Sequence, residues 1–489
     1  MNSPSAQRLA RDGLVALVVT AAAAGACATM WWAGTAIASD GSAAVLTTVV
    51  ALSLGRRTFG TRLEFARSAA LLPVIGLLAG AIGWLLLVLP PLGAALFVAG
   101  MSVPIWMRRF GPRVAHLGAL IALPLTAVLV APVSPSPGVP AWVTALLVLV
   151  AGVVASLWVT VAREVLRLIP AERGRMQQAE VLRAQEAGVP APRAGRRLPA
   201  STRMALQMAA ALTAAFLVGW AMFPGHVMWV VLTAFLVCAG NRGRADVVHK
   251  SALRVVGALG GTLGALAVIA LLPGATGPGV VIAIFVALLV GTWLRPISYA
   301  FWAVAVTLVL SLLQELTGMV TLTAETGMLA ERLAAIVVGA ILGIAASWFL
   351  LPVRSTDVLR RRLSDMLLAL GAVVAPAQEA AADQDALVAE FRAAVGRVEQ
   401  LAPANRAARL VRGRRRPLAI DCIEAAAALP AALDLHLADG PAAAAAGASD
   451  RLRVAIGRAR RSLAAPVDFE RTHAALTSLA AVLRGPAAP

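Results

Sequence analysis

The sequence predicts an all-α membrane protein with about twelve transmembrane helices and a C-terminal cytoplasmic α-helical domain. Three observations support this fold class. First, the 489 residues are 60% hydrophobic and only 14% charged, whereas soluble domains contain about 25% charged residues. Second, long apolar runs recur over the first 350 positions, as expected of membrane helices. Third, the chain becomes polar and alanine-rich after Arg354.

Twelve candidate membrane helices fall into two sets of six. The first set is predicted at residues 14–38, 42–55, 67–88, 92–106, 114–130 and 141–168. The second set is predicted at residues 204–223, 227–240, 253–272, 280–294, 298–313 and 330–351. The first run also resembles a signal peptide, because Arg8 and Arg11 precede it. It is too long for a signal h-region, so we interpret it as the first membrane helix.

Basic residues follow every second predicted helix, and the other connections carry almost no positive charge. The positive-inside rule therefore predicts that both termini and the arginine-rich linker, residues 170–202, lie in the cytoplasm of a plasma-membrane protein. Arg242 and Arg254, which follow the eighth helix, are predicted to fix this topology. The abundance of arginine and alanine is typical of a GC-rich bacterial genome.

The net charge of +18 also fits a nucleic-acid-binding protein, but its distribution argues against this function. The region after residue 354 contains 18 basic and 14 acidic residues, an excess of only four. Elsewhere nearly all basic residues lie in the loops that the topology places in the cytoplasm. The segment VRGRRRP, residues 411–417, is compatible with contact to nucleic acid or anionic lipid, although a solvated helix end is the simpler interpretation.

The two sets of helices resemble each other. Pairs of matching residues recur at offsets of 186 to 191 positions: Leu46-Thr47 with Leu232-Thr233, Arg67 with Arg254, Trp106 with Trp293, and Trp158 with Trp348. Because an even number of spans preserves orientation, this pattern predicts two parallel six-helix repeats. The predicted domains are a first repeat at 1–169, a linker at 170–202, a second repeat at 203–354 and a cytoplasmic domain at 355–489.

The second and eighth helices are unusually short. At about 14 residues they rise only about 21 Å, against a hydrocarbon core of about 30 Å. Short segments at corresponding positions of two repeats indicate a transporter's binding site. Thr47 and Thr233 lie within them, and Trp229 lies at the start of the eighth helix. Tilted helices with nothing bound fit the same pattern.

Ionisable residues within the predicted spans are few. Asp40, Glu315 and Glu331 lie near the outer ends, and Arg332 is the basic residue that the topology places outside the cytoplasm. Arg332 fits an anion site, but an ion pair with Glu331 or Glu315 is the simpler interpretation. The candidate substrate path therefore contains Thr47, Thr233, Trp229, Asp40, Glu315, Glu331 and Arg332. Gly257 and Gly261 are predicted to form a helix-packing face.

No pattern indicates an enzyme. The five histidines and three cysteines show no metal-binding spacing, and neither a phosphate-binding glycine loop nor a nucleophile elbow is found. We therefore expect no catalytic activity, no cofactor and no bound metal.

The segment HVMWVVLTAFLV, followed by RVVGALGGTLGAL, resembles the fusaric acid resistance protein-like (FUSC) family of membrane transporters, which is related to aromatic acid exporters. Trp229, Thr233, Arg254, Gly257 and Gly261 match the family pattern, and the resemblance covers about residues 203–352. It implies two six-helix bundles, a cytoplasmic domain and efflux of aromatic or other organic acids.

The first half matches this pattern less well, because Ala70 and Val74 replace the two glycines expected after Arg67. Three functions fit the whole sequence. The first is a secondary transporter that exports small organic anions; the others are a passive anion channel and a non-transporting scaffold that acts through its cytoplasmic domain. A major-facilitator carrier fits less well, because GNRGRADVVHK has the wrong residue order for that fold's basic loop. The expected partners are the lipid bilayer and a small organic anion, and a homo-oligomer or an accessory subunit stays open.

Overall fold

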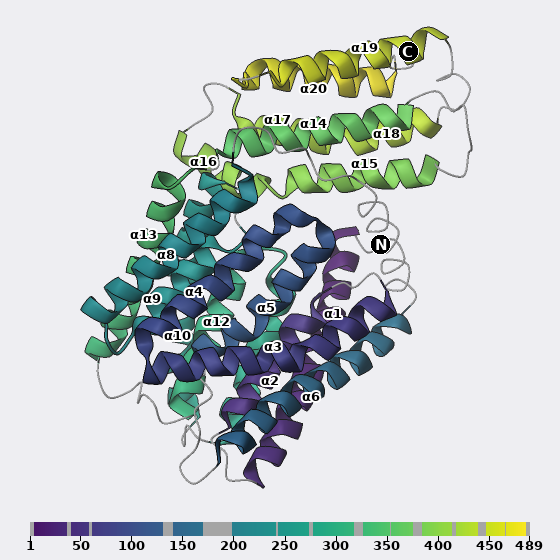
Figure 1. The fold of residues 1–489 in the computed structure, drawn as a ribbon. Coiled ribbons are helices and arrows are strands. Elements are labelled where there is room, and N and C mark those ends of the chain that lie inside the picture. The colour runs from purple at the N-terminus through teal and green to yellow at the C-terminus, as the bar shows by residue number, and fades with distance from the viewer. Residues whose placement is uncertain are drawn as a thin grey trace. The chain divides into compact units, whose positions relative to one another are not determined.

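The computed structural model describes residues 4–36, 41–57, 61–130, 140–169, 198–240, 243–272, 277–316, 326–352, 354–374, 384–412, 417–438, 446–464 and 466–485 (Figure 1). Within these residues all regular secondary structure is helical, without a β-strand. It divides into two compact units. The first comprises Met1–Ala239 and Lys250–Leu351, and the second comprises Gly240–His249 and Pro352–Pro489.

A helix lies at each of the twelve positions predicted in the apolar part of the chain. They are α1 (Pro4–Thr35), α2 (Ser42–Gly55), α3 (Arg62–Val88), α4 (Pro90–Met107), α5 (Pro112–Val130), α6 (Ala141–Arg167), α8 (Ala200–Met222), α9 (Val227–Cys238), α10 (Arg244–Leu271), α11 (Pro278–Leu294), α12 (Tyr299–Leu316) and α13 (Thr326–Phe349).

Eight of these helices are long and apolar enough to cross a membrane: α1, α3, α4, α6, α8, α10, α12 and α13. The others, α2, α5, α9 and α11, contain shorter apolar segments. The predicted short helices are short in the structure as well, with 14 residues in α2 and 12 in α9. That all twelve helices span the bilayer stays a prediction.

The first unit directs large apolar side chains outward as well as inward. Leu217, Leu263 and Ile282 are each at least 60% exposed, and many other leucines, valines and tryptophans of this unit are exposed as well. Soluble proteins rarely expose large apolar patches. This unit therefore suits a lipid environment, in which an outward leucine has no unfavourable contact with water.

Helices distant in the sequence pack together in the first unit. Helix α1 contacts α2, α6 and α11, whereas α8 contacts α9, α13 and α4. The interior consists of two apolar clusters, one centred on α1, α2 and α6, and the other on α8, α9 and α13. Each short helix thus lies at the centre of a cluster, where it contributes buried residues along most of its length.

Several helices begin earlier than the sequence predicted; α1, for example, begins at Pro4 instead of residue 14. Helix α3 begins at Arg62 instead of residue 67, and α10 begins at Arg244 instead of residue 253. The prediction assigned these basic residues to loops, but arginine and lysine have high helix propensity, and Asp246 in the first turn of α10 favours a helix start there. As a result Arg254 lies inside α10 rather than at its beginning.

The second unit contains α14 (Ser355–Val374), α15 (Gln384–Glu399), α16 (Ala402–Arg412), α17 (Ala419–Ala427), α18 (Leu429–Ala438), α19 (Ala446–Ser462) and α20 (Phe469–Arg484). Its own apolar core is formed by residues from all seven of these helices and includes Phe391, Ile420 and Leu479. A separate core is what an independent helical domain requires.

The sequence missed two details of this unit. The sequence predicts helices here near residues 357–374, 385–399, 420–437, 450–463 and 469–483. Helix α16 lies outside these ranges, and the helix predicted at 420–437 is divided into α17 and α18. The division falls at Pro430, which lacks a backbone N–H and is best tolerated in the first turn of a helix. In the basic segment, residues 411 and 412 end α16, and 413–416 lie outside the described residues.

Candidate functional site

Two buried arginines approach the same stretch of α12. Arg254 on α10 is 0% exposed and Arg332 on α13 is 4% exposed. Arg254 Nη1 donates to Thr307 Oγ1 at 2.9 Å and to the Ala303 carbonyl at 3.4 Å. Arg332 Nη2 donates to Ser311 Oγ at 2.6 Å and to the Thr307 carbonyl at 3.4 Å. Thr307 is therefore shared by both guanidinium groups.

Helix α9 contributes an aromatic ring to this site. The guanidinium carbon of Arg332 lies 3.7 Å from the centre of the Trp229 ring, and Trp229 is itself buried. A cation over an indole face is attracted to it, most strongly where water is excluded. One turn further along α9, the buried hydroxyl of Thr233 has no hydrogen-bond partner among the described residues. We call Arg254, Arg332, Trp229, Thr307 and Ser311 the arginine cluster.

The glycines of α10 allow Arg254 to reach α12. Gly257 and Gly261 lie three and seven positions after Arg254, on the same face of the helix. A Cβ atom on Gly257 would lie 2.4 Å from the Ala303 Cβ, and one on Gly261 would lie 2.5 Å from the Val304 carbonyl oxygen. Any larger residue would therefore push the two helices apart and withdraw the arginine from Thr307.

Helix α13 positions Arg332 by the same means. Gly339 lies seven residues after Arg332, on the same face of the helix. A Cβ on Gly339 would lie 2.4 Å from the Val230 carbonyl oxygen of α9. The close approach of α9 and α13 places the Trp229 ring beside the guanidinium group.

The charges of the cluster are not balanced by carboxylates. Neither Arg254 nor Arg332 forms an ion pair within the described part of the chain, and Arg254 Nε, Arg254 Nη2 and Arg332 Nε have no hydrogen-bond partner there. An uncompensated buried charge costs about 3–5 kcal/mol, and more in a bilayer interior. Free guanidinium N–H groups match the geometry of a carboxylate. The cluster is therefore chemically suited to an anion.

The two glutamates considered from the sequence do not pair with Arg332. Glu331 points outward, and its Oε2 atom lies 3.8 Å from Nδ1 of His226, which is the residue before α9. Glu315 is half-buried near the end of α12. The simpler interpretation of Arg332, an ion pair opening the twelfth helix, is therefore wrong. The reason is rotation along the helix, since adjacent residues project about 100° apart.

The remaining predicted residues lie elsewhere or are not described. Thr47 is buried in α2, and its hydroxyl donates to the Ala43 carbonyl at 2.6 Å, so it is satisfied within its own helix. Asp40 and Arg242 fall outside the described residues. Lys250 donates to the Ala239 carbonyl at the end of α9, at 3.3 Å. A cation is favourable there, because the C-terminus of a helix carries partial negative charge.

Sequence reasoning missed Thr307 and Ser311. A signal was present, because Ala303, Thr307 and Ser311 are spaced four residues apart on an otherwise apolar helix. Such spacing places small side chains on one face, where a glycine-containing helix can approach closely.

The apolar helices define the chain as a multi-pass helical membrane protein. Residues 210–346 match the fusaric acid resistance protein-like family, which confirms the resemblance that the sequence suggested. The matched region contains the whole arginine cluster, and together with the apolar helices it indicates a transporter-type protein. No curated protein and no solved structure matches the chain.

Proposed function

We propose that the chain is a secondary transporter of the plasma membrane, which exports small organic anions such as aromatic acids, and that the arginine cluster binds the anion. The observation that carries this proposal is the burial of Arg254 and Arg332 without a carboxylate partner among the described residues. Fixed positive charge in an apolar interior is costly. A substrate carboxylate would compensate it, because its two oxygens accept the free N–H groups of a guanidinium fork.

The aromatic part of such a substrate would contact Trp229. The ring already holds the Arg332 cation against its face, so a bound carboxylate on that cation would bring the substrate's own ring close to the indole. Aromatic pairs contribute about 0.5–1.5 kcal/mol beyond the area they bury. This supports aromatic acids over small inorganic anions as substrates.

The site is closed to solvent, since Thr233, Thr307 and Ser311 are all 0% exposed. A transporter must open such a site to each side in turn. The short helix α9 is suited to this movement, because it ends at an extended residue, Ala239, followed by Gly240 with a φ of 67°. We infer that α9 shifts between α8 and α13 when the substrate enters.

The packing of the helices supports the proposed twelve-span arrangement with two parallel repeats. The first helix of each set contacts the second and sixth helices of its own set and the fourth helix of the other set: α1 with α2, α6 and α11, and α8 with α9, α13 and α4. A pseudo-twofold relation between the sets accounts for this correspondence. In this arrangement both termini, the linker and the second unit lie in the cytoplasm.

The two sets differ at the proposed site. Arg67, which corresponds to Arg254 in the predicted repeat, is exposed, and Trp142 occupies the neighbourhood that corresponds to Arg332 and is also exposed. We therefore assign substrate binding to the second half, and a structural role to the first.

Uptake of radiolabelled benzoic and cinnamic acids into everted membrane vesicles tests this function. Wild-type vesicles should accumulate at least one acid when energised, and Arg332→Gln should reduce accumulation at least about tenfold, the cost of one charge-assisted contact. Arg67→Gln removes the same charge from an exposed position and serves as the matched control. Normal membrane abundance of both variants must be shown by immunoblotting.

Three results would contradict the proposal. Absence of uptake for all acids at several pH values would exclude this substrate class. Macroscopic anion current that is insensitive to a proton gradient would indicate a passive channel. If deletion of residues 355–489 abolished function while Arg332→Gln had no effect, the protein would be a scaffold.

A further inference from the structure

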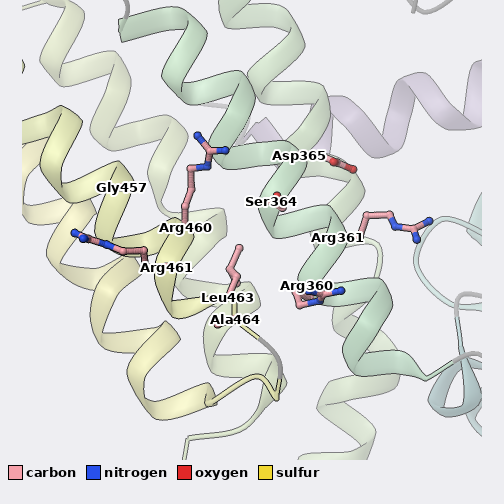
Figure 2. Close-up of a pocket in the computed structure, with 9 residues that line it drawn as sticks. All are labelled: Arg360, Arg361, Ser364, Asp365, Gly457, Arg460, Arg461, Leu463 and Ala464. Carbon is pink, nitrogen blue, oxygen red and sulfur yellow. The ribbon is translucent and has the colours of Figure 1, made fainter. Parts of the chain in front are cut away.

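A pocket lined by arginines lies in the C-terminal unit, between α14 and α19. It is open to solvent and has a volume of about 790 Å³. Arg360 and Arg361 line it from α14, and Arg460 and Arg461 line it from α19, together with a single carboxylate, Asp365 (Figure 2). The pocket thus carries three more positive than negative charges.

The pocket arginines lack the carboxylate partners that some arginines of the same unit have. Arg392 pairs with Asp434 at 2.6 Å, and Arg409 pairs with Glu424 at 2.9 Å. Within the described residues, none of the four pocket arginines forms an ion pair or a hydrogen bond with another side chain. All four side chains are exposed to solvent, and a multivalent anion bound between the helices would attract each of them.

The shape of the pocket leaves room for a ligand. Arg360 and Ser364 are four residues apart and therefore share one face of α14. On α19, a Cβ atom on Gly457 would meet no heavy atom within 4 Å. Figure 2 shows the Leu463 side chain between the two helices, with Arg460 on one side and Arg360 on the other. The apolar Leu463 thus lies between an arginine of α14 and an arginine of α19.

We propose that this pocket binds a small soluble molecule that carries at least two phosphate groups, such as a nucleoside diphosphate or triphosphate. Arginine binds phosphate oxygens through two parallel N–H donors, and a ligand with several phosphates matches an excess of three charges better than a monocarboxylate does. The volume falls in the range of about 300–1,000 Å³ that is usual for small-molecule sites. The site is distinct from the arginine cluster, because it belongs to the other unit and presents exposed guanidinium groups.

The purified full-length protein in neutral detergent allows a direct test by isothermal titration calorimetry with pyrophosphate and with ATP. Wild type should bind both, and Arg360→Gln/Arg460→Gln should weaken binding at least about tenfold. Arg458→Gln is the matched control, because Arg458 is an exposed arginine of α19 outside the pocket lining. Its affinity should stay within about twofold of wild type. Arg360→Lys/Arg460→Lys keeps the charges without the fork geometry and should give an intermediate affinity.

Two further arms separate this site from other sources of binding. Arg332→Gln should bind pyrophosphate like wild type, so the result is independent of anion transport. In nanodiscs, pyrophosphate should bind equally well with phosphatidylcholine alone and with added phosphatidylglycerol. Loss of binding in the anionic discs would assign the pocket to a lipid headgroup instead. The proposal is overturned by that outcome, by absence of binding at millimolar pyrophosphate, or by equal affinity of wild type and Arg360→Gln/Arg460→Gln.

Discussion

The guanidinium group of Arg332 stacks on the Trp229 ring, with 3.7 Å between the guanidinium carbon and the ring centre. The two residues lie about one hundred positions apart in the sequence, and the close packing of α9 and α13 brings them together. The ring stabilises the buried cation while leaving its outer N–H groups available to an anion. Both residues belong to the region that matches the transporter family.

Trp229→Leu should lower the apparent affinity for the transported acid about fivefold, because a desolvated cation–π contact contributes about 1–2 kcal/mol. Trp229→Phe keeps an aromatic face and should retain most of that affinity. The measurement is the concentration dependence of uptake into vesicles. Trp220→Leu removes a ring that contacts Phe216 instead of an arginine, and it should leave the apparent affinity unchanged.

Arg254→Met separates a structural role of this residue from a functional one. Replacing buried charge by an apolar side chain of similar size is often neutral or stabilising, so the apparent melting temperature should stay the same or rise. Transport should nevertheless fall at least about tenfold. A marked loss of thermal stability or of membrane abundance, with normal turnover per molecule, would show that Arg254 serves the fold.

Gly261→Ala should destabilise the first unit by about 1–3 kcal/mol, because the added methyl group meets the Val304 carbonyl at 2.5 Å and the Thr307 Cβ at 2.7 Å. Gly260→Ala is the control on the same helix, since its methyl group would meet only the tip of the Val304 side chain at 3.3 Å. Thermal unfolding in detergent measures both. Equal stability of the two variants would contradict the close helix contact.

His226 predicts a dependence of stability on pH. Partial burial lowers the pKa of His226, Glu331 acts in the opposite direction and Arg332 reinforces the decrease. In the unfolded chain the histidine has a pKa of about 6.5, so near this pH the unfolded chain binds more protons than the folded chain. The free energy of unfolding must therefore decrease as the pH falls through about 6.5. The apparent melting temperature of His226→Gln should decrease less than that of wild type when the pH falls from about 7.5 to about 5.5.

Glu331→Gln provides the complementary test, because it removes the carboxylate that opposes the decrease in the pKa of His226. This variant should lose more thermal stability than wild type over the same pH range. A smaller loss would contradict the electrostatic coupling between Glu331 and His226.

Cys422 should be unreactive until the second unit unfolds. Burial, together with Asp421 and Asp468, raises the pKa of its thiol to about 12, and only the thiolate reacts with maleimide. In a Cys27→Ser/Cys238→Ser background, denaturant should increase the labelling rate at pH 8 at least about a hundredfold. Ala464→Cys in the same background places a thiol at an exposed position and should be labelled at once. Rapid labelling of folded Cys422 would contradict its burial in the core.

The sequence alone determined the membrane class, the positions of the twelve apolar helices, the shortness of α2 and α9, and the family resemblance that the match to residues 210–346 confirms. These features depend on local composition, because apolar runs and helix-breaking turns act over a few neighbouring residues. The same local reasoning failed at the start of α10, where basic residues continue a helix that the prediction began later.

Only the tertiary structure decided the partners of Arg332 and Arg254. The sequence identified Trp229, Thr233 and Arg332 as candidates but associated Arg332 with Glu331, its neighbour, whereas the structure turns these two side chains toward different surroundings. Thr307 and Ser311 became recognisable only when α10 and α13 met the same face of α12. Contacts between helices depend on the rotation of each helix about its axis and on how closely glycines let two backbones approach. Neither can be deduced from the residues of one helix alone.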